Sequence, residues 1–417
     1  MPCCYWITMN QKSILIFILL GTIHFKCHSQ FKIGFTMPEG VNRVEMPFTP
    51  VNNLVVIPVV LNHFLKLNFI LDTGVETPIL TERAFANFVG IEYSREVIIS
   101  APGLNDSIRA LVGHRVNFKL PGNVTGHNLN LLVLQDDYLK LSEKMGMEVH
   151  GIIGYDIFQK FVVEINYDER KLILYRPTKY RPKRNQEVIP LNITQTKPYV
   201  QSLVSQNKVG DTINLMIDSG ASHALLLDIE QVEINLPTRT VHTRLGTGLG
   251  GDIIGQIGRI DSFRLHEYEF KDIIVSIPDE NAYSQLIKRG SRQGTLGGDI
   301  LSRLHPVFDY SNEKLFISKS RTYRNRFEFD MSGLSLSCQG AFLDSIFVQH
   351  VRQNSPADLA GIKEGDIILS INGHNSIYHP MTAFLALLKK KPNIKIRVRL
   401  LRGEEKLKKV FRLKRAV

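Results

Sequence analysis

The sequence has little cysteine. It contains four cysteines among 417 residues, and three of them, Cys3, Cys4 and Cys27, lie within the first thirty. A single cysteine beyond that segment, Cys338, cannot form an internal disulfide or a cysteine-ligated metal site. No histidine or asparagine partner for Cys338 is recognisable, so we expect a small strand residue rather than a nucleophile. The fold must therefore depend on its hydrophobic cores.

Long apolar runs are also missing. The most apolar one, Ile14–Leu20, is far shorter than the roughly 20 residues of a spanning helix. Lys12 precedes it, and Cys27 and Ser29 stand at the −3 and −1 positions for cleavage before Gln30. This pattern is typical of a secretory signal. We predict a signal peptide over residues 1–29, an exported protein, periplasmic or extracellular, and no stable membrane span. An uncleaved membrane anchor is the alternative.

The charge does not indicate nucleic-acid binding. The formal net charge is +11, but much of the excess lies in residues 176–184 and 389–415. No basic stripe alternates with stacking aromatics, and no zinc-finger spacing occurs. Isolated basic segments of this kind are usually solvated. We therefore predict no nucleic-acid partner. The apolar share of 43% suffices for sizeable cores, and the length predicts two or three domains.

Two halves of the chain repeat one another. Four pairs of segments match in the same order and at nearly constant spacing: 67–74 with 213–220, 113–120 with 258–265, 151–157 with 294–300, and 166–172 with 309–315. Four ordered matches indicate duplication of one unit. The copies span about residues 33–178 and 187–320. Alternating and apolar runs predict that each copy is mainly β, with one short helix after its first motif.

Local patterns give further expectations. Residues 54–61 form an apolar strand, and Pro58 within it favours an edge position. The first short helix is expected over residues 81–88. The basic, proline-bearing linker 176–186 is expected to lack regular structure. We expect capping or turn roles for Asp156, Asp299 and Asp309, and structural or exposed positions for His63, His114 and His223.

Each copy carries an Asp-(Thr/Ser)-Gly motif directly after an apolar strand. The motifs are Asp72-Thr73-Gly74 and Asp218-Ser219-Gly220. The hydroxyl of Thr73 or Ser219 can bond to the backbone of the other copy, and the glycines permit a tight turn. A twofold relation would place Asp72 beside Asp218. Two such carboxylates cannot both ionise, so they share one proton; one acts as base on water and the other as acid.

These paired motifs resemble the retropepsin-like aspartic peptidase family over residues 33–320. The apolar-apolar-Gly sequences ending at Gly154 and Gly297 belong to the same resemblance. It implies two pseudo-twofold-related β lobes of the acid protease fold, residues 30–180 and 181–320, within one monomeric chain. It also implies flaps, placed by position around Gly103 and Gly248. No cofactor or metal is expected.

The first motif departs from the family pattern. Where the second copy continues with Ala221-Ser222, the first continues with Val75-Glu76. Glu76 could place a third carboxylate near the pair, which leaves the pH optimum open. We expect it to point away from the two aspartates if the site is active.

Residues 322–417 resemble a PDZ domain, an α+β fold. The segment Gly333-Leu334-Ser335-Leu336 is similar to the carboxylate-binding loop of that family, and residues 355–373 carry its most specific motif. A helix from Pro356 to Gly361, a strand over 367–371, a groove helix over 381–388 and closing strands over 394–400 and 407–413 are expected. PDZ domains bind extended peptides at a sheet edge. The resemblance implies a peptide C-terminus or an internal extended segment as ligand.

Two functions remain open on these residues. The favoured one is an aspartic endopeptidase that cleaves extended or unfolded polypeptides, with the PDZ domain assisting substrate binding or regulation. The alternative is a non-catalytic peptide-binding protein that retains the two-lobed fold. The intact pair Asp72 and Asp218 favours the enzyme.

Overall fold

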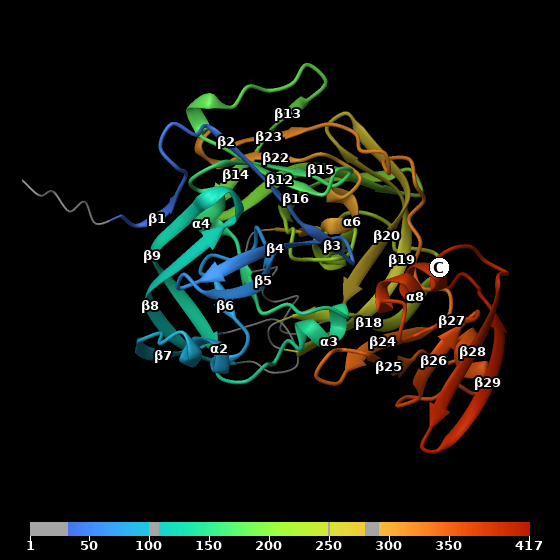
Figure 1. The fold of residues 1–417 in the computed structure, drawn as a ribbon. Helices are drawn as coiled ribbons and strands as arrows, with labels where there is room; N and C mark the ends of the chain where they lie inside the picture. The colour runs from blue at the N-terminus through green and yellow to red at the C-terminus, as the bar shows by residue number, and fades with distance from the viewer. Residues whose placement is uncertain (1–31, 100–107, 249–250, 280–291) are drawn as a thin grey trace, which may run out of the picture. The chain divides into compact units, whose positions relative to one another are not determined.

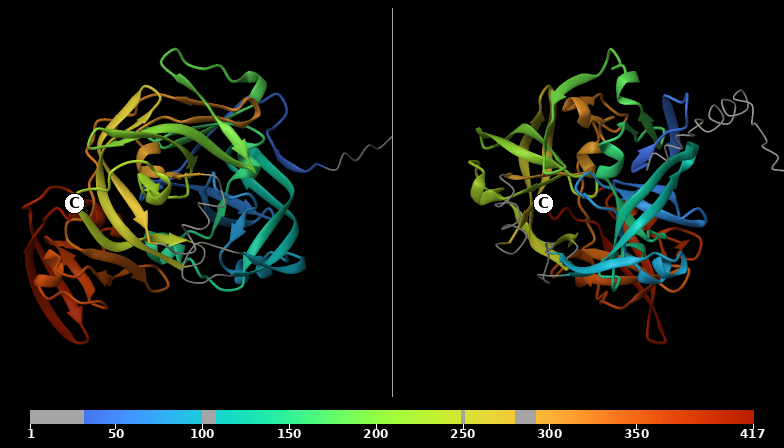
Figure 2. Two further views of the ribbon diagram at one scale, coloured as in Figure 1. Left: turned by 180° about the vertical axis from the view of Figure 1, so that it is seen from behind. Right: turned by 90° about the vertical axis from the view of Figure 1, so that its left-hand side faces the viewer.

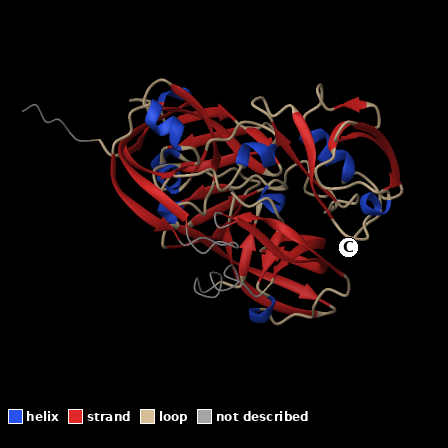
Figure 3. Ribbon diagram, turned by 90° about the horizontal axis from the view of Figure 1, so that it is seen from below, coloured by secondary structure: helices blue, strands red, loops and turns tan. Residues whose placement is uncertain are grey.

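The computed structural model describes residues 32–99, 108–248, 251–279 and 292–417. The chain divides into two compact units, Met1–Ile33 and Gly34–Val417, and the second is described here by itself. Strands dominate it, and the helices are short (Figure 3). Mainly β architecture is thus confirmed. The predicted signal peptide lies outside the described residues. Within the described residues, no helix is long and apolar enough to cross a membrane.

The first lobe is built on one mixed sheet with the order β1-β9-β6-β10-β5-β4-β8-β7, with β3 added to β4. Its strands are β1 (Gly34–Thr36), β3 (Thr49–Val51), β4 (Leu54–Leu61), β5 (Leu65–Leu71), β6 (Ile79–Leu80), β7 (Tyr93–Ile99), β8 (Ile108–Leu120), β9 (Val124–Leu134) and β10 (Gly151–Ile153). Its helices are α2 (Arg83–Phe88), α3 (Leu141–Met145) and α4 (Tyr155–Phe158), with a 3-10 turn η1 (Pro121–Asn123). The predicted helix over 81–88 is therefore confirmed, beginning at Arg83.

The second lobe repeats this arrangement, with the sheet order β14-β15-β16-β21-β17-β20-β19-β18. Its strands are β14 (Asn192–Thr194), β15 (Lys197–Gln206), β16 (Val209–Ile217), β17 (Leu225–Leu227), β18 (Thr240–Gly248), β19 (Gly251–Leu265), β20 (Tyr268–Pro278) and β21 (Gly294–Leu296). The described part of this lobe also contains a 3-10 turn η3 (Ile229–Gln231) and a helix α6 (Gly298–Leu301). In both lobes the strand before the aspartate runs parallel to the strand of the glycine motif, β5 with β10 and β16 with β21.

A six-stranded sheet joins the two lobes, in the order β13-β23-β22-β11-β12-β2. Its strands are β2 (Arg43–Pro47), β11 (Val162–Asn166), β12 (Lys171–Tyr175), β13 (Glu187–Pro190), β22 (Val307–Asp309) and β23 (Lys314–Ile317), with 3-10 turns η2 (Pro177–Lys179) and η4 (Tyr310–Asn312). Each lobe contributes three equivalent strands in mirrored order. The pair β11 and β22 meets at the centre, where Val163 faces Phe308. This order requires the pseudo-twofold relation that the repeats predict (Figures 1 and 2).

Two local expectations were wrong. The strand β4 is not at an edge, because it lies between β5 and β8. Pro58 is tolerated because β3 pairs with β4 only as far as Val56 and β8 only from Val60. The missing N–H of Pro58 therefore falls in a gap between these two partners. The linker, expected to be irregular, contains the 3-10 turn η2 over Pro177–Lys179.

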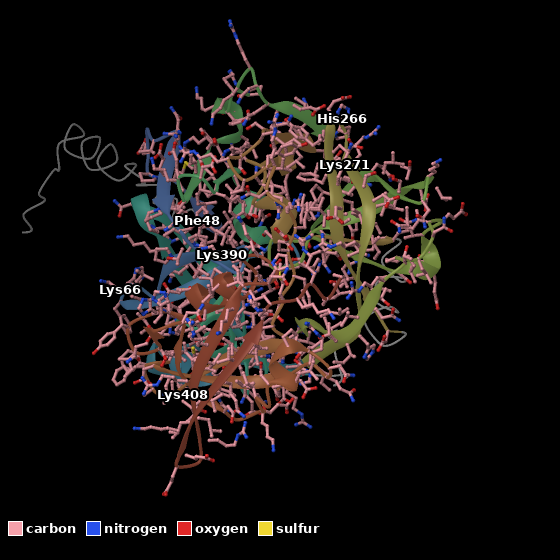
Figure 4. All side chains as sticks on the ribbon, turned by 90° about the vertical axis from the view of Figure 1, so that its right-hand side faces the viewer. Phe48, Lys66, His266, Lys271, Lys390 and Lys408 are labelled. Atoms are coloured by element: carbon pink, nitrogen blue, oxygen red, sulfur yellow. The ribbon has the colours of Figure 1, made fainter. Side chains whose placement is uncertain are left out.

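The C-terminal domain follows its expected pattern closely. Its sheet has the order β24-β25-β26-β28-β29, with β27 added to β26. The elements are β24 (Leu334–Gln339), β25 (Ser345–Val351), α7 (Pro356–Leu359), β26 (Ile367–Ile371), β27 (His374–Asn375), α8 (Met381–Leu388), β28 (Lys395–Arg402) and β29 (Glu405–Arg412). Ser355 caps α7 by accepting a hydrogen bond from the Asp358 N–H. The basic side chains Lys390 and Lys408 are exposed on this domain (Figure 4).

Separate hydrophobic cores mark the domains. One large core runs through both lobes and the joining sheet and ends, along the chain, at Phe327. Another belongs to the C-terminal domain and begins at Met331. Arg303 stacks on the ring of Phe327, with 3.7 Å between its guanidinium carbon and the ring centroid. The segment around Phe327 thus packs with the second lobe.

Candidate active site

The fold brings the two predicted aspartates together from equivalent positions. Asp72 follows the buried end of β5, and Asp218 follows the buried end of β16. The backbone N–H of Asp72 donates to the carbonyl of Ile153, and that of Asp218 to the carbonyl of Leu296, each at 2.9 Å. The parallel strands β10 and β21 therefore fix each aspartate in the same way.

The carboxyl groups of Asp72 and Asp218 lie next to one another: a Cβ atom on Gly74 would lie 3.1 Å from Asp72 Oδ1 and 3.6 Å from Asp218 Cγ. The N–H of Gly74 donates to Asp72 Oδ1 at 2.6 Å, and the N–H of Gly220 donates to Asp218 Oδ1 at 2.9 Å. Both residues remain partly exposed. A Cβ atom on Gly220 would lie 2.3 Å from Asp72 Oδ2, so only glycine leaves room for the pair.

Thr73 and Ser219 interlock the two loops behind the aspartates. Thr73 Oγ1 donates to the carbonyl of Ile217 at 2.7 Å, and Ser219 Oγ donates to the carbonyl of Leu71 at 2.8 Å. Each hydroxyl also accepts the other residue's backbone N–H at 3.0 Å. All four bonds cross between lobes and are buried. The interlobe contact inferred from the motif is present.

This environment favours one shared proton. Burial raises the pKa of Asp72 well above its usual range, and the neighbouring charge of Asp218 raises it further. The Gly74 N–H opposes these effects. Two adjacent carboxyls with one proton titrate as a pair and can supply one base and one acid at the same pH.

Glu76 does not join the pair. It is exposed, and its charge acts on Asp156, whose pKa is raised to about 6 mainly by burial and further by Glu76. Asp156 lies in α4, the short helix that follows Gly154. The first motif's departure from the family pattern thus places its extra carboxylate against α4.

The glycines Gly154 and Gly297 allow the closest packing around the loops. A Cβ on Gly154 would lie 1.8 Å from the carbonyl oxygen of Asp72. A Cβ on Gly297 would lie 2.3 Å from the carbonyl oxygen of His223. Both positions exclude any side chain, which accounts for a glycine in each repeat.

The two predicted flaps have different outcomes. Gly103 lies outside the described residues. Gly248 ends β18 in the hairpin that β18 forms with β19. Beside it the Thr247 hydroxyl donates to Asp252 at 2.9 Å, and Arg244 pairs with Asp252 at 3.1 Å. That this hairpin covers the aspartates stays a prediction.

Sequence reasoning missed two polar neighbours of the aspartates. Tyr310 is buried, and the charge of Asp72 adds to the burial that raises its pKa. His223 has a pKa lowered to about 4 by burial, which the charge of Asp218 opposes. The Tyr310 hydroxyl and His223 Nε2 have no partner among the described residues. The only available clue was the recurrence of tyrosine at Tyr167 and Tyr310 in the repeats.

The PDZ-like loop is preceded by two polar residues, Asp330 and Ser332, that accept hydrogen bonds from its backbone donors. Gly333 has a φ of +87° and opens β24. Its N–H donates to the carboxylate of Asp330, and the Leu334 N–H donates to Ser332 Oγ at 3.0 Å. Ser335 and Leu336 lie within β24, opposite His350 and Val348 of β25. Two donors of the predicted carboxylate-binding loop are thus already bonded.

One surface group among the described residues has metal-ligand spacing. Ligand atoms of Glu187, His266 and Glu267 lie within 4.8 Å of one another. His266 bonds directly to Glu187. Figure 4 shows His266 at the surface, and none of these residues belongs to the loops that carry Asp72 and Asp218.

Comparison with known families gives two matches. Residues 204–300 match the family described as aspartyl protease, and residues 347–402 match the PDZ domain. The chain contains an aspartyl protease domain and a PDZ domain. The first match covers the motif at Asp218 and the strand ending at Leu296, while the second begins after β24. No curated protein matches the chain.

Proposed function

We propose that the protein is an aspartic endopeptidase that hydrolyses peptide bonds in extended or unfolded polypeptides. One observation supports this above all: the carboxyls of Asp72 and Asp218 lie next to one another, partly exposed, and are held by symmetric loops from both lobes. A binding protein would not need a pair of carboxyls whose proximity disfavours their ionisation.

The chemistry follows from the shared proton. The ionised carboxylate takes a proton from a water molecule, whose oxygen attacks the scissile carbonyl carbon. The protonated carboxyl donates its proton to the carbonyl oxygen, which gives a neutral tetrahedral diol. Breakdown then returns a proton to the amine that leaves. The four bonds of Thr73 and Ser219 keep both carboxyls in position throughout.

The substrate class rests on the same geometry. An active site between two β lobes accepts a chain in extended form, and folded domains seldom present such a segment. The PDZ domain assists by binding peptide or by regulating access. We further propose that the chain is exported, on the pattern of residues 1–29, and that it acts as a monomer, since both aspartates come from one chain.

Incubation with a reduced, alkylated protein at several pH values tests this function. Cleavage products should appear for the unaltered chain and disappear in parallel preparations of Asp72→Asn and Asp218→Asn. If no product forms at any pH, while a labelled unfolded protein binds equally to all three chains, the alternative of a non-catalytic peptide-binding protein replaces the enzyme.

A further inference from the structure

The resemblance to PDZ domains places the peptide-binding groove between β24 and α8. Among the described strands, β24 pairs with β25 alone, so its other edge is the place where a PDZ domain adds a peptide strand. Cys338 on β24 and Met381 at the start of α8 line this groove from its two sides, with 3.8 Å between their sulfur atoms. Both side chains are buried.

A segment of the first lobe enters this groove. It consists of α3 (Leu141–Met145) and its C-cap Gly146, and α3 lies against β24 (Figure 1). A Cβ on Gly146 would be 3.0 Å from Met381 Cβ and 3.3 Å from Cys338 Sγ. Gly146 therefore touches both walls of the groove. A peptide strand cannot occupy the same place while this segment stays there.

The loop at the end of the groove favours an internal segment as ligand. A C-terminal carboxylate needs free backbone N–H donors, but those of Gly333 and Leu334 already bond to Asp330 and Ser332. The carboxylate of Asp330 would also repel that of a peptide. A ligand without a terminal charge in the loop, such as Leu141–Gly146, avoids both costs.

The same segment reaches the flap hairpin of the second lobe. Lys144 Nζ donates to Thr247 Oγ1 at 3.0 Å, one residue from Gly248. A second bond ties the hairpin to the PDZ domain, because Arg244 donates to Gln349 Oε1 at 2.8 Å. A cavity of about 740 Å³ lies alongside it, between β18 and the end of β25. The hairpin is thus bonded to the first lobe and to the PDZ domain, and the cavity beside it leaves space into which it can move.

We propose that Leu141–Gly146 is the internal ligand of the PDZ groove and that it couples the groove to the second flap. An extended polypeptide segment takes the groove only by displacing Leu141–Gly146, and this releases the Lys144 contact with Thr247. The flap is then held by the bond from Arg244 to Gln349 and no longer by Lys144, which eases its opening to substrate. The effect on turnover rests on the proposed peptidase function, whereas occupation of the groove does not.

A reversible crosslink tests the proposal. In the chain from Gln30 onward, Cys338 is the only cysteine, and Gly146→Cys places a second thiol within disulfide reach of it. Oxidised glutathione should close this disulfide in most molecules. The crosslinked form should cleave a reduced, alkylated protein about fivefold more slowly, because the flap stays attached. Dithiothreitol should restore the rate.

Gly146→Ser is the matched control, since it introduces a side chain of similar size at the same positive φ without a thiol. Its rate should not respond to oxidation or reduction. Absence of the disulfide would overturn the occupation of the groove. A disulfide that leaves turnover unchanged would overturn the coupling. If the reduced protein is wholly inactive, the peptidase function fails, while the yield of disulfide still tests the occupation.

A second measurement needs no change at Gly146. Reaction of Cys338 with a maleimide should be slow, because the thiol is buried and burial raises its pKa to about 11. Lys144→Ala removes the flap contact and should raise this rate several-fold. Lys140→Ala changes the N-cap residue of the same helix, whose side chain pairs with Glu143 at the surface, and should leave the rate unchanged. Equal rates in all three chains would contradict the proposal.

Discussion

Thr73 and Ser219 each accept the other's backbone N–H at 3.0 Å, across the boundary between the lobes. Each also donates its hydroxyl to the strand that leads to the opposite aspartate, at Ile217 and Leu71. Both side chains are buried, so water cannot replace these bonds. The position of one aspartate therefore depends on the loop that carries the other.

Ser219→Ala should weaken both the fold and catalysis. It leaves the Thr73 N–H and the Leu71 carbonyl without their partner, at a cost of about 1–3 kcal/mol for each buried orphan. Thermal unfolding and cleavage rates measure the two effects. Ser219→Thr is the control, because the first repeat uses threonine at this place. Stability and turnover unaffected by alanine would show that the interlock does not position the pair.

Asp72→Asn and Asp218→Asn should each abolish cleavage while keeping the fold. Each amide occupies nearly the same volume but can neither share a proton nor act as a base. Loss of turnover of at least about 10³-fold is expected, since base and acid catalysis are both lost. Cleavage of an unfolded protein and the melting temperature are the two readings. Near-normal turnover in either variant would remove the dyad assignment.

The pH profile should have two limbs. At low pH both carboxyls are protonated and no base remains. As pH rises through the raised pKa of Asp72, the shared proton is lost and the rate falls again. Asp72→Asn should abolish cleavage at every pH, so that the alkaline limb of the pH profile is lost with the activity. A rate that never falls again as pH rises, up to the pH at which the fold is lost, would be inconsistent with one shared proton.

The stability of the fold should also depend on the protonation of Asp72. The folded pKa of Asp72 is above its unfolded value, so the native state binds more protons, and stability is lost as pH rises through the folded pKa. Asp156, with a pKa raised to about 6, contributes with the same sign. Measured at a series of pH values, the melting temperature should depend less on pH in Asp156→Asn and in Asp72→Asn than in the unaltered chain.

The repeats made much of the structure predictable. Matching motifs at Asp72 and Asp218 implied two equivalent lobes, and residues 355–373 implied the order of α7, β26 and the turn at Asn372, where φ is +50°. These features depend on local sequence: an apolar strand, a glycine that must be small, a proline that begins a helix. Local rules suffice for them.

Other features depend on contacts between distant segments. The placement of β4 between two strands depends on where β3 and β8 end, which no property of Pro58 reveals. The approach of Gly146 to Cys338 joins segments of different domains, and neither carries a motif for it. Nor does any sequence motif mark Asp330 as the acceptor for the Gly333 N–H.

The last prediction concerns Gly220, whose missing side chain leaves room for Asp72. A Cβ there would lie 2.3 Å from Asp72 Cγ, closer than packed atoms approach, so Gly220→Ala must displace the carboxyl or the loop. Turnover should fall by at least about 10²-fold, because a shift of 1 Å in a catalytic group has effects of this order. Gly210→Ala is the control in the same lobe, since its Cβ would approach no atom closer than 3.5 Å. Because Gly220 bears no functional group, a loss of activity confined to Gly220→Ala would trace catalysis to the proximity of the two carboxyls themselves. Full activity in that variant would mean that Asp72 works from a position other than the one beside Asp218.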